Sequence, residues 1–480
     1  MNTANMRRST PVEQRMNCEK LYKLIMYLRN SKQKVQSLLV LRNGYAVADV
    51  HFYPFHGEVA YYLNCCTASV ISALVGIALG EGLIGDLGDK VLGYLPEYTV
   101  DPEDQRKKEI TIEHLLQMAA GLVWDDVNNV FGENNYFDRM ILSDDPVGFI
   151  LAQPMREEAG KRYNHCVGAP HLLSAVLQKV TGMSTAAYAE EKLFKPLGIN
   201  GAVWSSDNNG ISIGGSGLSM TAEGLAKIGQ LYLQKGKWEG MQIIPESWIS
   251  LSTKKHIDTP EGPWSFYGGG YQWNINRFGG YSAKGVNGQY LSVVPNLKLV
   301  AVIMASLPVD ELFWPETLME SFIIPAARFA DTGQANRQNQ DKLTELINEI
   351  KAPPEPKPVP PLPEIAPKIS GRKFVFNTPS HIQGISLDFC HKDSCIFKAF
   401  YDGGIMEAPA GLDDVYRITG NEAYKGYWQD SNTFIAKMLN LSMNFEMEHR
   451  ITFQEGGVGY ELFSPLWGVC EKLEGGLASE

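Results

Sequence analysis

The chain has 480 residues, 44% of them hydrophobic and 20% charged, and its formal net charge is −11 at pH 7. This composition is typical of a folded globular protein and excludes disordered, collagen-like and coiled-coil chains. The negative charge would repel phosphate backbones and anionic lipid, so we expect no nucleic acid and no membrane as a partner. At about 150 residues per domain, the length predicts two or three units, in the simplest case one large domain and a smaller one.

Targeting and redox signals are weak. Residues 1–15 are polar, and they are not followed by the apolar stretch of about 7–15 residues that a secretory signal requires. We therefore expect a cytoplasmic protein whose seven cysteines are free thiols. Their spacing does not match a zinc site, so we expect no metal, and no motif predicts a cofactor. The sequence does not indicate which oligomeric state the protein adopts.

The first half of the chain begins with helix and hairpin patterns. Apolar spacing over residues 17–36 predicts a helix, and residues 37–50 predict a hairpin that turns at Asn43 and Gly44. Residues 65–80 are apolar on almost every face, which indicates a helix buried inside a domain. Further helices are expected before residue 198, notably over 112–120 and 169–181.

Strand patterns return at residues 270–275, 290–294 and 299–304. The order of helix, strands, helices and strands predicts an α+β domain. We expect one antiparallel sheet that is flanked by helices, is completed from both ends of the domain and holds an all-helical insertion between its strands.

The sequence predicts domain boundaries at both ends of this unit. We expect residues 1–13 to be disordered and residues 14–345 to form the large domain. Residues 346–367 are rich in proline and predict an extended linker. Short alternating stretches over residues 368–480 then predict a small all-β domain, either a sandwich or a barrel.

Four segments carry a resemblance to a known family. They are residues 110–121 (ITIEHLLQMAAG), 193–199 (LFKPLGI), 214–222 (GGSGLSMTA) and 285–289 (GVNGQ). They are similar to segments of serine hydrolases related to class C β-lactamases, penicillin-binding carboxypeptidases, and the esterases and amide hydrolases that share their fold. The resemblance spans roughly residues 35–310 and implies a β-lactamase or transpeptidase-like fold.

The catalytic motifs of that family are changed in this chain. The family's Ser-x-x-Lys motif falls on residues 65–68, where Cys65 stands for the serine and Ala68 for the lysine. The family's tyrosine falls on His165, and Tyr163 is then the aromatic residue two positions earlier, which we expect to be structural. The third motif falls on residues 286–288, where only Gly288 matches.

The replacements suggest a different nucleophile. A thiol needs less help than a hydroxyl to ionise, and Cys65 at a helix N-terminus would be favoured as a thiolate. His165 could then act as its base, as a cysteine and histidine pair requires. The resemblance implies an oxyanion hole from the backbone amides of Cys65 and of Gln289, which follows Gly288. Lys284 is a candidate cation for a substrate carboxylate.

Two hypotheses follow. In the first, the protein is an acyl hydrolase or acyltransferase that acts on a small ester, amide or thioester through a cysteine acyl-enzyme. In the second, it is an inactive relative with a binding or regulatory role, Cys65 and His165 are buried packing residues, and Lys284 is a solvated surface lysine. The first hypothesis expects Cys65 and His165 to meet in an open cleft, and the second expects apolar side chains to fill it.

Overall fold

The computed structural model describes residues 6–32, 34–100, 104–125, 135–259, 267–308, 311–328, 333–455, 457–465 and 468–478. The chain forms two compact units. The first comprises Met1–Phe52 and Ala60–Glu349, and the second comprises Tyr53–Val59 and Ile350–Glu480. None of the helices within the described ranges has the length and apolarity needed to cross a membrane.

A seven-stranded antiparallel sheet, in the order β2-β1-β12-β11-β10-β9-β8, forms the centre of the first unit. The N-terminal hairpin pairs with β12, so strands from both ends of the unit complete one sheet, as predicted. The first seven residues of β12 are all buried, in keeping with its central place. The strands are β1 (Lys34–Arg42), β2 (Tyr45–His51), β8 (Gly268–Gly269), β9 (Asn274–Ile275), β10 (Tyr281–Lys284), β11 (Tyr290–Val294) and β12 (Leu299–Ser306).

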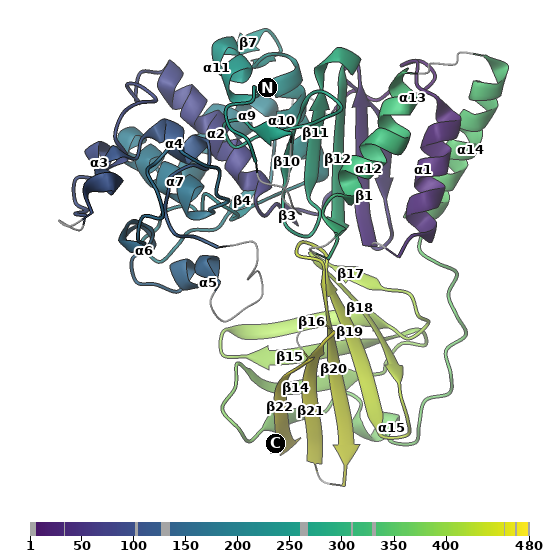
Figure 1. The fold of residues 1–480 in the computed structure, drawn as a ribbon. Helices are drawn as coiled ribbons and strands as arrows, with labels where there is room; N and C mark the ends of the chain where they lie inside the picture. Colours follow the sequence, from purple (N-terminus) through teal and green to yellow (C-terminus); the bar gives the residue numbers. More distant parts are fainter. Residues whose placement is uncertain are drawn as a thin grey trace. The chain divides into compact units, whose positions relative to one another are not determined.

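Helices cover both faces of this sheet (Figure 1). On one side lie α1 (Cys18–Asn30), α12 (Trp314–Leu318), α13 (Ile324–Arg328) and α14 (Gln334–Lys351), and on the other lie α2 (Cys66–Gly80), α10 (Ala222–Leu233) and α11 (Glu246–Ser252). Gly229 lets α10 pack closely on the sheet, because a Cβ there would lie 2.6 Å from Leu291 Cδ1. The first helix is shorter than predicted, because the strand β1 begins at Lys34.

The insertion between α2 and α10 is mainly helical, and it also contains short strands. A small sheet of order β3-β5-β4 joins β3 (Tyr61–Tyr62), which directly precedes α2, to β4 (Val203–Trp204) and β5 (Leu218–Met220). Strands of two or three residues show no alternating pattern, which explains why the sequence did not predict them. The helices are α3 (Val91–Tyr94), α4 (Ile112–Leu116), α5 (Tyr136–Ile141), α6 (Pro146–Ala152), α7 (Gly168–Thr181), α8 (Thr185–Ala189) and α9 (Lys195–Leu197).

The N-terminal segment differs from the expected disorder. Backbone hydrogen bonds join Ser9 N–H to Ala46 O at 3.1 Å and Ala46 N–H to Arg7 O at 2.8 Å, and Arg8 pairs with Asp49 at 2.6 Å. β2 is an edge strand, and the segment occupies backbone groups that such an edge leaves open. Residues 6–13 are therefore ordered, whereas residues 1–5 of the predicted disordered stretch lie outside the described residues.

The second unit is an all-β barrel rather than a sandwich. Its strands follow the order β16-β15-β14-β13-β22-β21-β20-β19-β18-β17, and a parallel pairing of β16 with β18 closes the barrel. Apolar side chains, among them Phe397, Phe434 and Ile451, fill its interior. The strands are β13 (Lys373–Phe376), β14 (Ile382–Asp388), β15 (Ser394–Tyr401), β16 (Gly404–Gly411), β17 (Arg417–Thr419), β18 (Glu422–Trp428), β19 (Thr433–Asn440), β20 (Phe445–Gln454), β21 (Gly457–Ser464) and β22 (Gly468–Leu477).

The proline-rich segment is anchored to this barrel. The predicted linker, residues 346–367, overlaps the end of α14 and the start of α15 (Ala366–Ile369). Between these helices, Lys357 N–H donates to Asp413 O at 2.9 Å, and Lys357 Nζ pairs with Asp414 at 2.5 Å. The segment therefore belongs to the second unit instead of acting as a free spacer.

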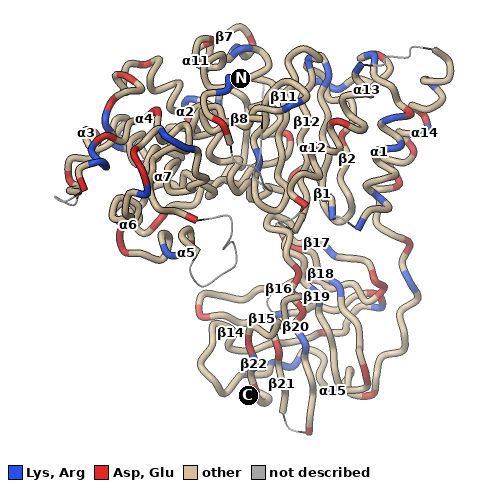
Figure 2. The backbone as a smooth tube through the Cα atoms, viewed as in Figure 1, with Lys and Arg blue, Asp and Glu red and all other residues tan. Residues whose placement is uncertain are grey.

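Charged residues of both signs are interspersed along both units (Figure 2). Within the described part of the chain, no run of lysine and arginine stands apart from acidic residues, as a groove for a phosphate backbone would require.

Candidate active site

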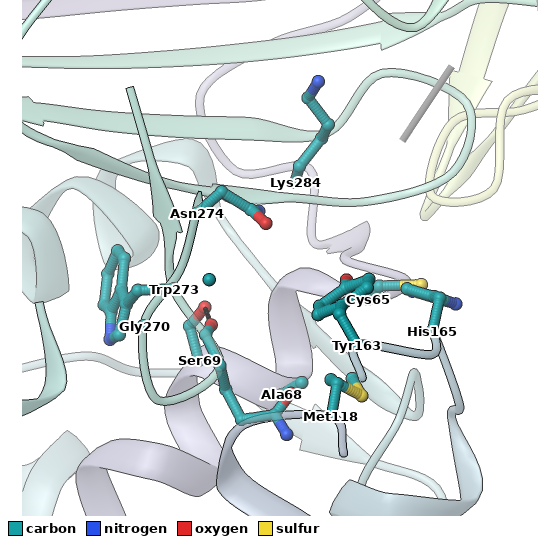
Figure 3. Close-up of a pocket in the computed structure, with 12 residues that line it drawn as sticks. Cys65, Ala68, Ser69, Met118, Tyr163, His165, Gly270, Trp273, Asn274 and Lys284 are labelled. Carbon is teal, nitrogen blue, oxygen red and sulfur yellow. Dashed lines mark hydrogen bonds between the residues drawn. The ribbon is translucent and has the colours of Figure 1, made fainter. Parts of the chain in front are cut away.

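A pocket in the first unit brings together three of the predicted site residues, Cys65, His165 and Lys284 (Figure 3). They come from the start of α2, the loop before α7 and the end of β10. The cavity volume is about 40 Å³, within about 460 Å³ of space that includes the part open to solvent. Its lining residues are Cys65, Ala68, Ser69, Met118, Tyr163, His165, Gly269, Gly270, Gln272, Trp273, Asn274 and Lys284.

Cys65 is the N-cap of the buried helix α2 and is partly exposed. Its side chain makes no capping hydrogen bond, so the sulfur is not committed to the helix end. The partial positive charge of a helix N-terminus favours an anion there, such as a thiolate. Ala68, one turn further on, also lines the pocket, with a small side chain in the place of the family's lysine.

Asn64 fixes the start of this helix against the turn between β10 and β11. Its backbone is left-handed, with φ of 48°, a conformation that asparagine tolerates better than most residues. Its side-chain amide donates to Val286 O and to Gln289 Oε1, each at 2.9 Å. The Cys66 thiol adds a third link by donating to Gln289 O at 3.4 Å. Asn64 and Cys66 thus hold the predicted third motif close to the nucleophile position.

Gln289 and Gly288 are placed beside the helix start but are not among the side chains that line the pocket. The Gln289 side chain is occupied by its bond to Asn64. Gly288 adopts φ of 94°, and a Cβ there would lie 2.7 Å from Leu307 Cδ1, so the turn and its packing both require glycine. Among the described residues, the backbone N–H groups of Cys65 and Gln289 donate no hydrogen bond.

His165 and Tyr163 both face the pocket from one loop. Asn164 between them holds this loop, because its N–H donates to Met118 O at 2.7 Å and its amide donates to Leu122 O and Trp124 O at 3.3 and 3.2 Å. Tyr163 and His165, two residues apart on this loop, both line the pocket.

Tyr163 is the main site residue that the sequence did not predict. Burial raises the pKa of its phenol, and the nearby Cys65 thiol raises this pKa further, which places the two side chains near one another. Tyr62, on β3, is also close to Cys65. Burial raises the pKa of Tyr62, its hydrogen bond to Ser216 at 3.2 Å opposes this shift, and Cys65 adds to it. The spacing of Tyr163 from His165 is the signal that could have identified Tyr163.

Lys284 is neither a solvated surface lysine nor a cation without a counter-ion. Only 2% of its side chain is exposed, and its Nζ lies 2.7 Å from a carboxylate oxygen of Glu316. The Nζ also lies 5.0 Å from the centre of the Phe313 ring. Burial lowers the pKa of Lys284 and raises the pKa of Glu316, and each partner opposes the shift of the other.

The pocket holds side chains of the types that are used in nucleophilic chemistry. Among the residues that the structure describes, no group of three His, Cys, Asp or Glu side chains could hold a metal ion. The pocket instead joins a thiol at a helix N-terminus, an imidazole and a phenol. These are the parts of a nucleophile with a neighbouring base.

Comparisons with known proteins agree with this fold. Residues 32–316 match the β-lactamase family model. The 6-aminohexanoate-dimer hydrolase of Paenarthrobacter ureafaciens is 24% identical over 312 residues, which cover 62% of this chain and 78% of that protein.

Two solved structures have the same fold. A putative 6-aminohexanoate-dimer hydrolase from Bacillus anthracis has a TM-score of 0.57 at 20% identity, covering 68% of this chain and 87% of that one. EstCE1, a hydrolase with promiscuous acyltransferase activity, has a TM-score of 0.54 at 16% identity, covering 64% of this chain and 99% of that one. Because the family model spans more than half of the residues, the chain belongs to the β-lactamase family.

Proposed function

We propose that the protein is an acyl hydrolase or acyltransferase that acts on small esters or amides through a thioester at Cys65. The observation that carries this proposal is the meeting of a partly exposed Cys65 and of His165 in one pocket. The similarity to an amide hydrolase and to an esterase with acyltransferase activity supports the substrate class.

In the proposed reaction, a nitrogen of the His165 ring takes the proton of the Cys65 thiol. The thiolate attacks the carbonyl carbon, forms the C–S bond and pushes the carbonyl electrons onto oxygen. Collapse of this tetrahedral intermediate breaks the bond to the leaving alcohol or amine, which takes the proton back from His165. Water or a second nucleophile then attacks the thioester with His165 as base and releases Cys65 as the thiol.

The oxyanion would bind at the backbone N–H groups of Cys65 and Gln289. Among the described residues neither group donates a backbone hydrogen bond, which leaves both as candidate donors to the oxyanion. Asn64 and Cys66 tie the turn that bears Gln289 to the helix that begins after Cys65, which would keep the two donors in register. Such fixed donors stabilise the charge that develops in the transition state.

The second hypothesis, an inactive binding protein, expects a buried Cys65 and a cleft filled by apolar side chains. Cys65 is partly exposed, and the pocket also presents polar groups of Tyr163, His165 and Asn274. These features favour the enzyme over the binding protein.

The test is acylation by p-nitrophenyl hexanoate, read by intact mass and peptide mapping. We expect one acyl group on Cys65, none in Cys65→Ala, and slow formation in His165→Ala. Cys395→Ala is a matched control, because this cysteine is buried in the barrel and its loss should leave acylation unchanged. No adduct, or acyl groups spread over the exposed Cys390 and Cys470, would leave the binding protein as the better account.

A further inference from the structure

The positive charge of Lys284 in the pocket lining is neutralised by an ion pair within the protein. Among the described lining residues, Lys284 is the only lysine or arginine, and no aspartate or glutamate lines the pocket. The Lys284 ammonium is paired with Glu316 at 2.7 Å, and Figure 3 shows this side chain extending away from the other labelled residues. The charge of Lys284 is therefore directed to Glu316 rather than to the space beside Cys65.

Apart from Cys65 and His165, between which the proposed reaction moves a proton, the remaining lining groups that the structure describes carry no fixed charge. Tyr163 contributes a phenol whose pKa is raised, so it stays protonated at neutral pH, and Asn274 contributes an amide. Ser69 donates its hydroxyl to Gln272 O at 2.6 Å, and Met118 and Trp273 supply apolar surface. The pocket thus offers neutral hydrogen-bonding groups and apolar surface.

A charged group on the acyl chain, placed away from Cys65 and His165, would lose water without gaining a counter-ion from the described lining residues, which costs free energy. An anionic group could recruit Lys284 only by breaking its pair with Glu316. Only 19% of the Glu316 side chain is exposed, and the break would leave this carboxylate without its cation. Removing one partner of a buried ion pair is strongly unfavourable.

We infer that the pocket selects acyl groups without a charge, and that the Lys284–Glu316 pair enforces this selection. The inference rests on the proposed function, because it concerns the group that is transferred to Cys65. The substrate class is then neutral esters or amides with an apolar acyl chain.

The experiment compares three p-nitrophenyl esters of similar chain length: the neutral heptanoate, the anionic mono-ester of adipate and the cationic 6-(trimethylammonio)hexanoate. Acylation of Cys65 is followed by release of p-nitrophenolate and by intact mass. We expect the neutral ester to react roughly tenfold faster than either charged ester, or more, because each charge is desolvated without a partner. A charged ester that reacts as fast as the neutral one would overturn the inference while leaving the cysteine acyl-enzyme intact. No acylation by any ester would overturn both.

Two variants test the role of the ion pair. Glu316→Gln leaves the Lys284 charge uncompensated, so the disadvantage of the adipate ester should shrink roughly tenfold. The double variant Lys284→Met, Glu316→Gln removes both charges and should keep the preference for the neutral ester, which provides a test even if Glu316→Gln does not fold. Glu246→Gln, at the exposed Lys235–Glu246 pair, is the matched control and should change nothing. If Glu316→Gln discriminates between the neutral and adipate esters as strongly as wild type, or if the double variant no longer does so, the ion pair does not enforce the selection.

Discussion

The pocket of the first unit and the interior of the barrel contain the same kinds of residue in different settings. In the pocket, His165 and Tyr163 line a space together with Cys65. In the barrel, His449 is 4% exposed, its Nδ1 lies 2.8 Å from the Tyr460 hydroxyl, and its ring packs against Phe397 at 4.9 Å. Burial lowers the pKa of His449 to about 4.

The difference lies in packing rather than in residue type. Apolar side chains fill the barrel around His449, so this histidine stabilises the fold as a neutral ring. Three elements meet around Cys65 without filling the space between them, so His165 lines a pocket instead of a packed core. A histidine beside a tyrosine is a candidate catalytic group only where the fold leaves a space that a substrate can enter.

The largest expected effect comes from removing the proposed base. His165→Ala should slow acylation of Cys65 by about 100-fold or more, in the range of general base catalysis. The measurement is the single-turnover release of p-nitrophenolate from the heptanoate ester. His449→Gln is the matched control in the barrel and should react at the wild-type rate. Equal rates in His165→Ala and wild type would remove the distinction between the two histidines.

The buried histidine should instead affect stability as a function of pH. The pKa of His449 is lowered from 6.5 to about 4 in the folded state, so the unfolded state binds more protons between these values. Its contribution is fully present above pH 6.5 and is lost as the pH falls towards 4, by up to about 3 kcal/mol.

Urea unfolding of the full chain at several pH values measures this contribution. In His449→Gln, which does not titrate in this range, the fall in stability between pH 6.5 and 4 should be smaller by that amount. The same pH dependence in both proteins would show that His449 is not a buried neutral ring.

A smaller effect is expected from the residue that positions the helix start. Asn64→Gly keeps the left-handed backbone but removes the bonds to Val286 and Gln289. Acylation should slow roughly tenfold, because a misplaced oxyanion donor weakens transition-state stabilisation. The loss should appear in kcat more than in KM.

Asn43→Gly is the control for this variant, since Asn43 is also left-handed and its side chain also donates a hydrogen bond, to Gln14 in the N-terminal segment. Equal behaviour of the two variants, or a change in KM alone for Asn64→Gly, would argue against the positioning role.

The smallest effect is expected at the cysteine next to the proposed nucleophile. Cys66 is fully buried, and burial raises the pKa of its thiol well above the usual value. Cys66→Ala removes one long hydrogen bond to Gln289 O and leaves both bonds of Asn64, so acylation should stay within about twofold at a cost of about 1 kcal/mol of stability. Parallel rate and denaturation measurements check both values. A loss of acylation like that of Cys65→Ala would mean that the nucleophile was assigned to the wrong cysteine.

The sequence predicted the features that local patterns encode. The apolar runs of β11 and β12 and the hairpin at Asn43 predicted a sheet completed from both ends. The residues of α2, apolar on every face, predicted its buried position and hence the place of Cys65 at its start. Cys65 and His165 were expected to share a cleft because the family resemblance fixed their register, and the structure places them in one pocket.

Features that depend on distant partners were not predicted. Lys284 seemed a solvated lysine or a substrate ligand because nothing near it in the sequence identifies Glu316 as its partner. The order of residues 6–13 likewise depends on the distant strand β2. Alternation and helical periodicity report burial along one segment, whereas the choice of a partner for an edge or a charge depends on the assembled fold.

Relative thiol reactivity tests the central claim most directly. Cys390 and Cys470 in the barrel are exposed, whereas Cys65 is only partly exposed. Brief treatment with iodoacetamide at pH 7, followed by peptide mapping, compares the three thiols in one molecule. If His165 and the helix N-terminus activate Cys65, it should be labelled roughly tenfold faster than Cys390 and Cys470, and this lead should vanish in His165→Ala. Labelling in the order of exposure, with Cys390 and Cys470 ahead of Cys65, would contradict an activated nucleophile.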